Sequence, residues 1–495
     1  SLETIYRKRA RVRGSGLGGL AIAWRLRAIG YEVTVLEKQT NLGGRARTLS
    51  HNGFDYDAGP TVITAPYLIN ELYELLGENS RDYFNLLKVE PFYRFLFHDE
   101  TYFDYGSSLK RMLSEIGTKY SKKDAHGYIK LLKHSKRIFN TAYLKLSDYP
   151  FESLNSMTPY IPELLKIQFY KSVHSSVKKF LDNPNLIKAL SMHPLLVGGN
   201  PYTTTSIYLL IQYLEWKWGV YYAEGGTRSI VNGFEKLFRK KDINFETNCE
   251  VLNIEQHNNN IKKVITNKRI FQADLVVSNA DPSYFYQSIL KRAPKKIFNK
   301  PFMLKHSMGL FVLYFSTKKQ YDDIKHHTII FNKRHKDLLD DIFDRKVYIT
   351  DPSLYLHRPA ATDKKNVQND SDSFYVLAPV ANNESKINWN EKGAEFSEHI
   401  ISILSDKILP NLKENIIDKF FVTPDYFEFN LNSFKGSGFG IQPIFRQSAY
   451  FRYSNKSNEL DNLYFVGAGS HPGAGVPGVI SSAKVTEKLI LKYHG

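Results

Sequence analysis

The 495-residue sequence predicts an α/β fold with two domains, one built on a parallel sheet and the other of mixed α+β type. A glycine-rich turn over 14–19 is followed by an apolar, helix-like segment over 20–30 and a strand-like segment over 31–37. Further strand-like segments lie at 275–278 and 463–466. Because such strands occur at the start, in the middle and at the end of the chain, we expect the sheet domain to be discontinuous.

The turn over 14–19 fits the pattern G-x-G-x-x-G. Gly14, Gly16 and Gly19 occupy the three glycine positions, and Ser15 and Gly18 lie between them. In Rossmann-type folds the first glycine permits a tight turn, the second lets the backbone approach a pyrophosphate, and the third lets helix and strand pack closely. The N-terminus of the following helix then directs its N–H groups at the phosphates. Taken alone, the pattern also fits an ordinary glycine-rich turn.

An acidic residue follows at the spacing that dinucleotide-binding domains use. Glu37 lies 23 positions after Gly14, at the end of the strand-like segment. A carboxylate at this point accepts hydrogen bonds from ribose hydroxyls. Loop, helix, strand and acid thus occur in the expected order, and together they predict a dinucleotide site.

The segment expected to form the first strand departs from the usual pattern. It contains Arg9, Arg11 and Arg13, whereas a strand at the centre of a parallel sheet is normally apolar throughout. Each truly buried cation would cost several kcal/mol. Two explanations stay open: the strand is short and exposed at its start, or the basic stretch 1–13 is not the native beginning of the chain.

Two segments after Glu37 favour a flavin nucleotide over a nicotinamide nucleotide. The first, 43–47, has two adjacent glycines and two arginines, and the second, 57–61, has a Gly-Pro pair near its end. Backbone of this kind suits a chain wrapped round the phosphates and ring of a flavin, although a turn followed by surface arginines would have the same sequence. The residues predicted to contact FAD here are Gly44, Arg45, Asp57, Gly59, Pro60 and Thr61.

The carboxyl-terminal part contains a second glycine-rich loop, over 466–478, which precedes a helix-like segment over 479–493. Glycine lets the backbone pass close to a flat ligand, and N–H groups at the start of the helix can stabilise negative charge on a reduced flavin. His471 fits two roles, a catalytic base or a hydrogen-bonded anchor of the loop, and the sequence singles out no general base. The residues predicted to contact FAD here are Gly467, Gly469, Gly475 and Val476.

These segments divide the chain into two domains. We expect 1–66, 221–299 and 421–495 to form the FAD-binding domain, and 67–220 and 300–420 to form a substrate- and membrane-binding domain. The aromatic and aliphatic stretches at 208–222 and 311–315 suit the wall of an apolar tunnel. Plain core packing explains these stretches equally well.

Composition excludes several classes of protein. With 42% hydrophobic and 24% charged residues, the chain is a folded protein rather than a disordered or fibrous one. Its single cysteine, Cys249, excludes a disulfide framework and a cysteine-rich metal or iron–sulfur site. The 15 histidines show no H-E-x-x-H spacing, so no metal is expected.

No stretch approaches the ~18 uninterrupted apolar residues of a transmembrane segment, and residues 1–13 lack the apolar core of a signal peptide.

Charge and aromatic content indicate a surface partner. The net charge of +17 favours a polyanion, which is either nucleic acid or the anionic face of a membrane. The 32 Phe and 32 Tyr residues indicate a large apolar cavity or an interfacial surface. Because no nucleic-acid module is recognisable, we expect no nucleic-acid partner. An ordinary solvated surface is the alternative to an anionic-lipid patch.

Several motifs together resemble the bacterial phytoene desaturases, over essentially the full chain from Gly14 onward. The motifs are GSGLGG at 14–19, LEK at 36–38, LGGRA at 42–46, DAGPTVIT at 57–64, PLLVGGNP at 194–201, YAEGGT at 222–227, SNAD at 278–281 and HPGAGVPGVISSAK at 471–484. The last of these is the most specific.

The resemblance implies a flavoprotein of the amine-oxidase type, with a Rossmann-type FAD domain and a substrate domain. It implies successive dehydrogenations of the C40 polyene phytoene towards lycopene or neurosporene, in carotenoid biosynthesis. The implied partners are phytoene and the desaturated carotenoids, a membrane surface bound peripherally on the cytoplasmic side, and oxygen or a quinone as electron acceptor.

Three alternatives stay open. The first is another carotenoid enzyme of the same flavoprotein fold, namely a C30 desaturase, an isomerase or a ketolase. The second is a flavin amine oxidase, which would need polar groups that recognise an amine. The third is a non-catalytic lipid-binding flavoprotein, which is favoured if the basic first strand prevents FAD uptake.

Overall fold

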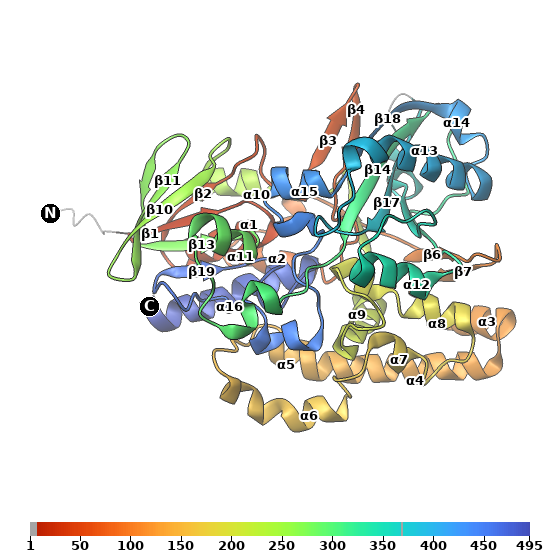
Figure 1. Cartoon of the computed structure of the whole chain (residues 1–495), viewed down its shortest axis with the longest axis horizontal. Helices are drawn as coiled ribbons and strands as arrows, with labels where there is room; N and C mark the ends of the chain where they lie inside the picture. The colour runs from red at the N-terminus through yellow and green to blue at the C-terminus, as the bar shows by residue number, and fades with distance from the viewer. Residues whose placement is uncertain (1–6, 368–369) are drawn as a thin grey trace.

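The computed structural model describes residues 7–367 and 370–495. Figure 1 shows two parts that lie side by side, one around a five-stranded sheet and the other around a seven-stranded sheet with a layer of helices below it. The expectation that residues 1–13 hold no signal peptide concerns a stretch of which residues 1–6 lie outside the described ranges.

The five-stranded sheet has the strand order β9–β2–β1–β13–β19, and all neighbouring strands are parallel. Its strands are β1 (Arg9–Arg13), β2 (Glu32–Leu36), β9 (Asn244–Glu246), β13 (Leu275–Ser278) and β19 (Leu463–Phe465). Numbered along the chain, this order is 3-2-1-4-5, which is the order of a Rossmann sheet with β1 at its centre. The predicted α/β fold with a Rossmann-type domain is therefore confirmed.

Helices from the start, the middle and the end of the chain pack on this sheet. They include α1 (Leu17–Ala28), α10 (Arg228–Lys240) and α16 (Val476–His494). All residues of α1 from Leu17 to Leu26 are buried, because the helix lies against the sheet, against α16 and against α10. Trp24 of α1 stacks on Phe238 of α10 with ring centroids 6.2 Å apart. The first helix and the last helix of the chain therefore share one core.

Three smaller antiparallel sheets are formed by segments that lie, along the chain, between strands of the two large sheets. A three-stranded sheet comprises β10 (Val251–His257), β11 (Asn260–Thr266) and β12 (Ile270–Gln272), in the order β10–β11–β12. Two-stranded pairs are formed by β3 (Thr48–His51) with β4 (Phe54–Asp57), and by β5 (Leu86–Lys88) with β8 (Tyr221–Ala223). The remaining short helices outside the lower layer are α2 (Tyr67–Glu74), α11 (Pro282–Tyr284), α12 (His335–Asp340), α14 (Leu412–Asn415) and α15 (Pro424–Leu431).

The seven-stranded sheet has the order β18–β14–β17–β16–β15–β6–β7. Its strands are β6 (Tyr93–Leu96), β7 (Tyr102–Tyr105), β14 (Gly309–Thr317), β15 (His327–Ile330), β16 (Leu354–His357), β17 (Asp372–Val380) and β18 (Ile416–Val422). The pairing of β15 with β6 is parallel, and the other pairings are antiparallel. Every residue of β14 is buried. The helix α13 (Trp389–Lys407) packs on this strand, where Phe311 contacts Phe396 with ring centroids 4.9 Å apart.

A layer of helices lies below the seven-stranded sheet in Figure 1. It comprises α3 (Leu109–Lys119), α4 (Lys122–Ile138), α5 (Leu144–Leu146), α6 (Ile161–Lys166), α7 (Val173–Val177), α8 (Pro184–Leu190) and α9 (Leu210–Trp218). The helix α6 is the outermost of them in this view.

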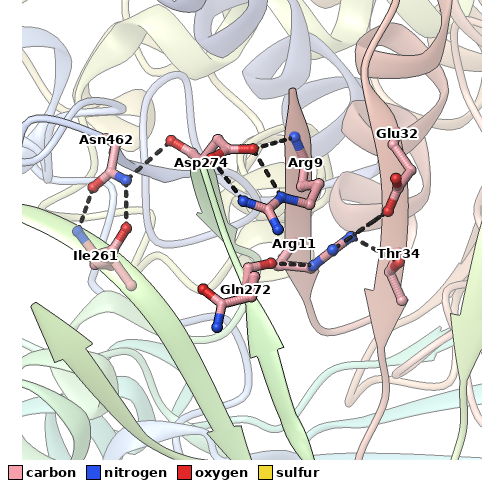
Figure 2. Close-up of polar contacts among 8 residues, drawn as sticks. All are labelled: Arg9, Arg11, Glu32, Thr34, Ile261, Gln272, Asp274 and Asn462. Carbon is pink, nitrogen blue, oxygen red and sulfur yellow. Dashed lines mark hydrogen bonds and ion pairs between the residues drawn. The ribbon is translucent and has the colours of Figure 1, made fainter. Parts of the chain in front are cut away.

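The arginines of β1 have partners on the neighbouring strands, as Figure 2 shows for two of them. Arg9 donates from Nε to Oδ2 of Asp274 at 3.0 Å and from Nη2 to Oδ1 at 3.2 Å. Arg11 donates to Thr34 Oγ1 at 2.9 Å and to the carbonyl oxygen of Gln272 at 2.8 Å. Its charge is compensated by Glu32, whose Oε1 atom lies 3.3 Å from Nη1 of Arg11, although burial lowers the pKa of Arg11.

Arg13 is accommodated differently, at the carboxyl end of the same strand. It is 6% exposed, and its guanidinium lies over the rings of Tyr284 and Phe285, 5.3 and 5.5 Å from their centroids. The strand is thus partly exposed at its start, at the half-buried Arg9, as the first explanation has it, and it is buried at Arg11 and Arg13. Specific partners, rather than exposure, make this basic strand compatible with the centre of the sheet.

The five strands of the parallel sheet all come from the three segments expected to form the FAD-binding domain. The segment 421–495 also contributes α15, which packs on β14 of the second sheet. The domain limits at 66, 220, 299 and 420 stay a prediction. Within the described residues, no helix has both the length and the apolar character needed to cross a membrane.

Replacing Asp274 with alanine should destabilise the protein, because it removes the carboxylate that accepts from the guanidinium and from the backbone N–H of Arg9. Hydrogen bonds to charged groups contribute about 1.5–3 kcal/mol when buried. Because the pair is partly exposed, we expect a loss of about 1–2 kcal/mol in the free energy of unfolding, measured by urea titration. The control is Glu255→Ala, which breaks a more exposed ion pair with Lys263 and should cost under about 0.5 kcal/mol. Equal losses in both variants would contradict the role of Asp274.

Candidate FAD site and its cavity

Three backbone segments approach one another closely at glycine residues. A methyl group on Gly44 would lie 3.1 Å from the Cα atom of Gly16, and one on Gly18 would lie 3.1 Å from the Cα atom of Gly467. Such distances are tighter than nearly all Cβ contacts in proteins. The glycine turn near the start of the chain and the glycine loop near its end therefore converge, as the sequence-based hypothesis of one shared nucleotide site requires.

The side chain of Asn279 lies at this convergence. A methyl group on Gly18 would lie 2.6 Å from its Oδ1 atom, and one on Gly16 would lie 2.6 Å from its Nδ2 atom. Asn279 directly follows β13, and its backbone N–H donates to the carbonyl oxygen of Arg13 at 2.8 Å. Our sequence reasoning quoted Asn279 only within a family motif. Its position at the carboxyl end of a central parallel strand, where Rossmann folds bind ligands, is the signal that identifies it.

Glu37 holds the glycine turn in place. Its Oε2 atom accepts from the backbone N–H of Ser15 at 2.9 Å and from the hydroxyl of Ser15 at 2.5 Å, and its Oε1 atom accepts from the backbone N–H of Gln39 at 2.8 Å. The Ser15 hydroxyl in turn accepts from the backbone N–H of Gly43 at 3.0 Å. A carboxylate has about four acceptor positions, so the three bonds leave one for a ribose hydroxyl.

Buried polar side chains fix the carboxyl-terminal loop. Arg452, which is 1% exposed, donates to the carbonyl oxygens of Ser470 at 3.1 Å and Ala468 at 2.6 Å. The hydroxyl of Ser482, on α16, accepts from the backbone N–H of Gly467 at 2.8 Å. The sequence carried no signal for Arg452, because its partners are backbone atoms that any residue could supply.

His471 is held as part of this loop. Its Nε2 atom lies 3.0 Å from the carbonyl oxygen of Leu146 and donates to it, and the ring packs edge-on against Phe151. Burial lowers the pKa of His471 to about 4, so the ring is neutral at physiological pH. These contacts support the role of loop anchor, the second of the two roles considered for this residue.

The converging loops form one end of a cavity of about 560 Å³. The other end is lined by apolar side chains of the helical layer and the second sheet. They include Leu164 of α6, Ile211 and Leu214 of α9, Val312 of β14, Leu338 of α12 and Leu377 of β17, together with Phe169, Phe331 and Phe439 from connecting segments. One continuous space therefore joins a backbone-lined end to a hydrocarbon-lined end.

Most of the predicted contact residues line this cavity. They are Gly14, Ser15, Gly16, Gly18, Glu37, Gly44, Arg45, Gly59, Pro60, Thr61, Gly467, Gly475 and Val476. Gly19, Asp57 and Gly469 lie behind the wall. A side chain on Gly19 would overlap the carbonyl oxygen of Gly14, and one on Gly469 would overlap Pro282. The carboxylate of Asp57 accepts from the Tyr222 hydroxyl at 2.7 Å and from the backbone N–H of Thr227 at 3.0 Å.

The two stretches considered as tunnel wall differ in their placement. From 208–222 the cavity is lined by Tyr208, Leu210, Ile211, Leu214 and Glu215. Within 311–315 only Val312 lines it, and Phe311 and Phe315 are core residues of the second sheet. Successive side chains along β14 point to opposite faces of the sheet. This alternation explains why Val312 lines the cavity and its neighbour Phe311 does not.

Arginines supply positive charge at the backbone-lined end. Arg13 and Arg45 both line the cavity, and burial lowers the pKa of each side chain. Arg45 donates from Nη2 to the hydroxyl of Ser433, but its buried Nε atom has no partner. A buried guanidinium N–H without an acceptor is unfavourable, and the phosphates of a nucleotide are the acceptors that suit it.

Glu215 is a carboxylate in the otherwise apolar part of the wall. It is fully buried, and it accepts from the Tyr93 hydroxyl at 2.6 Å and pairs with His193 Nε2 at 2.9 Å. These two partners compensate the cost of placing a carboxylate in this environment. The sequence-based reading treated the stretch around Glu215 as apolar wall and missed this network.

Comparison with known proteins identifies the family. The family model described as flavin containing amine oxidoreductase matches residues 17–486. The chain belongs to this family. It is therefore an FAD-dependent oxidoreductase.

The resemblance to phytoene desaturases is confirmed as well. The flavoenzyme is 40% identical over 489 residues to the phytoene desaturase (lycopene-forming) of Pseudescherichia vulneris, with 98% of this chain and 99% of the relative covered. It is 35% identical over 492 residues to the phytoene desaturase (neurosporene-forming) of Rhodobacter capsulatus, with 97% and 94% covered. Among solved structures, an oxidoreductase from Methanosarcina mazei has the same fold, with a TM-score of 0.65, 18% identity, and 97% and 100% of the two chains covered.

The geometry of the flavoenzyme fits FAD. The cradle of Gly16, Gly18, Gly44 and Gly467 brings bare backbone to the cavity, where added side chains would clash. Glu37 and Arg45 both line this cavity. Glu37 has one acceptor position free, and the Nε–H group of Arg45 has no partner. These are the donor and acceptor types that a dinucleotide engages.

Substituting Gly18 with alanine should prevent stable FAD binding, because the methyl group would lie 2.6 Å from Asn279 Oδ1 and 3.1 Å from Gly467. We expect the ratio of flavin absorbance to protein absorbance, measured after reconstitution with excess FAD, to fall at least ~10-fold. Gly117→Ala is the control, because a methyl group there meets only Ala125 at 3.9 Å. Normal flavin content in Gly18→Ala would show that the three segments do not enclose the cofactor.

Proposed function

We propose that this flavoenzyme is a phytoene desaturase, which dehydrogenates phytoene in successive steps towards lycopene or neurosporene in carotenoid biosynthesis. The observation that carries the proposal is the continuity of the cavity, whose backbone-lined end opens into a hydrocarbon-lined end. A polyene hydrocarbon offers no polar group for recognition, so an apolar wall must position it. The relatives named for this reaction, at 40% and 35% identity, support the same substrate class.

We assign the cofactor contacts as follows. Gly14, Ser15, Gly16 and Gly18, with the N-terminus of α1, bind the pyrophosphate, and Glu37 accepts from a ribose hydroxyl. Residues 44–45, 59–61, 467 and 475–476 surround the rest of the cofactor. The positions of these segments are fixed by three residues that do not line the cavity, namely Gly19, Asp57 and Gly469. The segments 1–66, 221–299 and 421–495 then form the FAD-binding domain, and 67–220 and 300–420 form the substrate domain.

The protein's own contribution to the reaction is orientation and exclusion of water. When bound, FAD supplies the two-electron oxidation of the substrate. Leucine, phenylalanine and tyrosine side chains along the cavity hold the chain of the polyene in one register and keep water away from the reacting carbons.

Product analysis tests the proposal directly. The FAD-loaded protein should convert phytoene in anionic liposomes into products with the visible absorption bands of lycopene or neurosporene, and chromatography should identify them. The assay is run in air and, without oxygen, with a quinone, because we propose that one of these two accepts the electrons. Gly18→Ala should give no bands, and Gly117→Ala should behave as the wild type.

The rival activities give different results in the same experiment. Bands from a C30 substrate alone would identify a C30 desaturase, a change of double-bond geometry without new double bonds would identify an isomerase, and oxygen incorporation would identify a ketolase. Hydrogen peroxide released from amines would identify an amine oxidase. Any of these outcomes, in the absence of phytoene dehydrogenation, would overturn the proposal.

We propose further that the enzyme binds peripherally to the cytoplasmic face of a membrane, through one surface formed by residues 154–170, 297–303 and 445–451. Aromatic contacts join the three segments, with Phe169 against Phe445 at 4.9 Å and Phe298 against Phe451 at 4.8 Å between ring centroids. We call this the lower surface. It includes α6, the outermost helix of the lower layer (Figure 1).

The lower surface presents both large apolar side chains and cations. Leu165, Phe302 and Phe445 are exposed, and the exposed fraction of Phe302 reaches 75%. Lys166 and Arg446 are exposed beside them in the sequence. Apolar side chains that insert into the lipid interface, together with cations near anionic headgroups, are the combination that holds a protein on a membrane.

The lower surface is also the outer side of the cavity wall. The same segments turn Tyr160, Leu164 and Phe169 towards the cavity, while Ile161 and Leu165 are exposed. A lipid-dissolved substrate would therefore pass from the bilayer into the cavity across a single layer of side chains. This arrangement supports entry of phytoene from the membrane.

Charged substitutions on the lower surface should weaken membrane binding. Burying one phenylalanine or leucine side chain contributes about 1.5–3 kcal/mol, so Leu165→Glu and Phe302→Glu should each lower the fraction bound in vesicle sedimentation about 10-fold or more. Phe429→Glu is the control, because Phe429 is 68% exposed on α15, on the other side of the molecule in Figure 1. Unchanged sedimentation of both lower-surface variants would exclude this surface as the membrane contact.

A further inference from the structure

Three buried histidines lie together in the second sheet, outside the cavity that fits FAD. His327 of β15 pairs in register with His357 of β16, and His326 directly precedes β15. Their exposed fractions are 3%, 0% and 1% for His326, His327 and His357. One ring nitrogen from each lies within 4.8 Å of the corresponding nitrogens of the other two. We call these residues the histidine cluster.

Each ring of the histidine cluster has one partnered nitrogen. His326 Nδ1 lies 2.7 Å from the Thr362 hydroxyl, and His327 Nδ1 lies 2.6 Å from the Tyr355 hydroxyl. The third partner is the buried carboxylate of Asp57, whose Oδ2 atom lies 3.4 Å from His357 Nε2. Because a carboxylate accepts, His357 carries its proton on Nε2, and its Nδ1 atom has a free lone pair.

The second nitrogen of every ring is buried without a partner. These atoms are His326 Nε2, His327 Nε2 and His357 Nδ1. Buried polar atoms nearly always have a partner, so one unpartnered ring nitrogen on each of three adjoining buried histidines indicates a missing ligand. Neutral imidazole, with one nitrogen free of a proton, is the form that binds metals.

We propose that His326, His327 and His357 bind one divalent transition-metal ion, of which Zn²⁺ suits the site best. Imidazole nitrogen is a preferred ligand of zinc. The outer contacts match as well, because metal-binding histidines usually present their other nitrogen to a carboxylate, hydroxyl or carbonyl. In a tetrahedral zinc site the nitrogens lie about 3.4 Å apart, so modest rotations of the rings complete the geometry from the spacing observed.

A small cavity lies beside one member of the cluster, His357. It has a volume of about 30 Å³, is lined by His357, Asp57, Gly225 and Gly226, among others, and is large enough for a water molecule. In zinc sites with three histidine ligands, water commonly takes the fourth position. The bound ion would tie the segment that begins at Asp57 to β15 and β16. It would thereby steady the cavity wall at Tyr355 and Thr61.

Cobalt binding tests the proposal on the full-length protein loaded with FAD. After treatment with a chelator, the wild type should take up one Co²⁺ per chain with visible d–d absorption, and Zn²⁺ should abolish that absorption. His326→Gln and His357→Gln should each weaken Co²⁺ binding at least ~10-fold. Asp57→Asn, which replaces the carboxylate beside His357 and leaves the three histidines in place, should weaken it about 10–100-fold.

His335→Gln is the matched control. His335 is also buried and also has an unpartnered Nδ1 atom, but it does not belong to the histidine cluster. Its replacement should leave Co²⁺ binding unchanged. Zn²⁺ should also raise the unfolding temperature of the wild type and of His335→Gln, but not that of His326→Gln.

Two results would overturn the proposal. One is a wild type that, once flavin absorbance shows it to be folded, binds no Co²⁺ and gains no thermal stability from Zn²⁺, which would mean that water fills the site. The other is an equal loss of binding in His335→Gln and His326→Gln. None of these measurements uses phytoene, so their outcome is independent of the proposed desaturase activity.

Discussion

The rest of the structure depends on the close approach of the glycine turn near the start of the chain to the segment after β2 and to the glycine loop near the end of the chain. Gly16 lies against Gly44, 28 positions away, and Gly18 lies against Gly467, 449 positions away, at distances that would crowd an added side chain. Such close approach of backbone to backbone favours glycine. It requires α1 and α16 to pack on each other, which places the first and last helices of the protein in one core. The discontinuous sheet is the consequence of this packing.

Buried polar side chains, rather than apolar contacts alone, hold the approach in register. Glu37 joins the glycine turn to the segment after β2 through Ser15, Gln39 and Gly43. Arg452 performs the same function for the terminal loop by donating to its carbonyl oxygens. An unsatisfied buried charge is costly, so each of these groups stabilises only the arrangement in which all of its partners are present. This explains how backbone loops with little side-chain packing of their own are held in one conformation.

What could be predicted from the sequence was local. The glycine turn, the following helix and strand, and Glu37 lie within 24 consecutive residues, and their spacing predicted a dinucleotide site with Gly16 and Gly18 in its cradle. Gly44 and Gly467 were predicted from two further glycine-rich segments. Asn279 was not predicted, because it reaches the turn from a strand some 265 positions away. Asp57 was predicted as a direct contact, yet Tyr222, Thr227 and His357 hold its carboxylate behind the wall. The histidine cluster had no motif to reveal it, since β15 and β16 bring its members together only in the folded sheet.

The family fold by itself does not select a substrate, because proteins of one fold carry many activities. The part of this chain that selects a substrate is the cavity wall at the hydrocarbon-lined end. An amine is recognised by polar groups that remain free to bind it. Here Glu215, a carboxylate in the wall, is already engaged by Tyr93 and His193. Other side chains of the cavity wall, such as Leu164, Phe169 and Leu214, offer only hydrocarbon surface to a ligand. The exposed Leu165 lies next to Leu164 in α6, so the same helix faces both the cavity and the outside. A wall with these properties suits a substrate that leaves a lipid phase for a protein interior without entering water, as a polyene must.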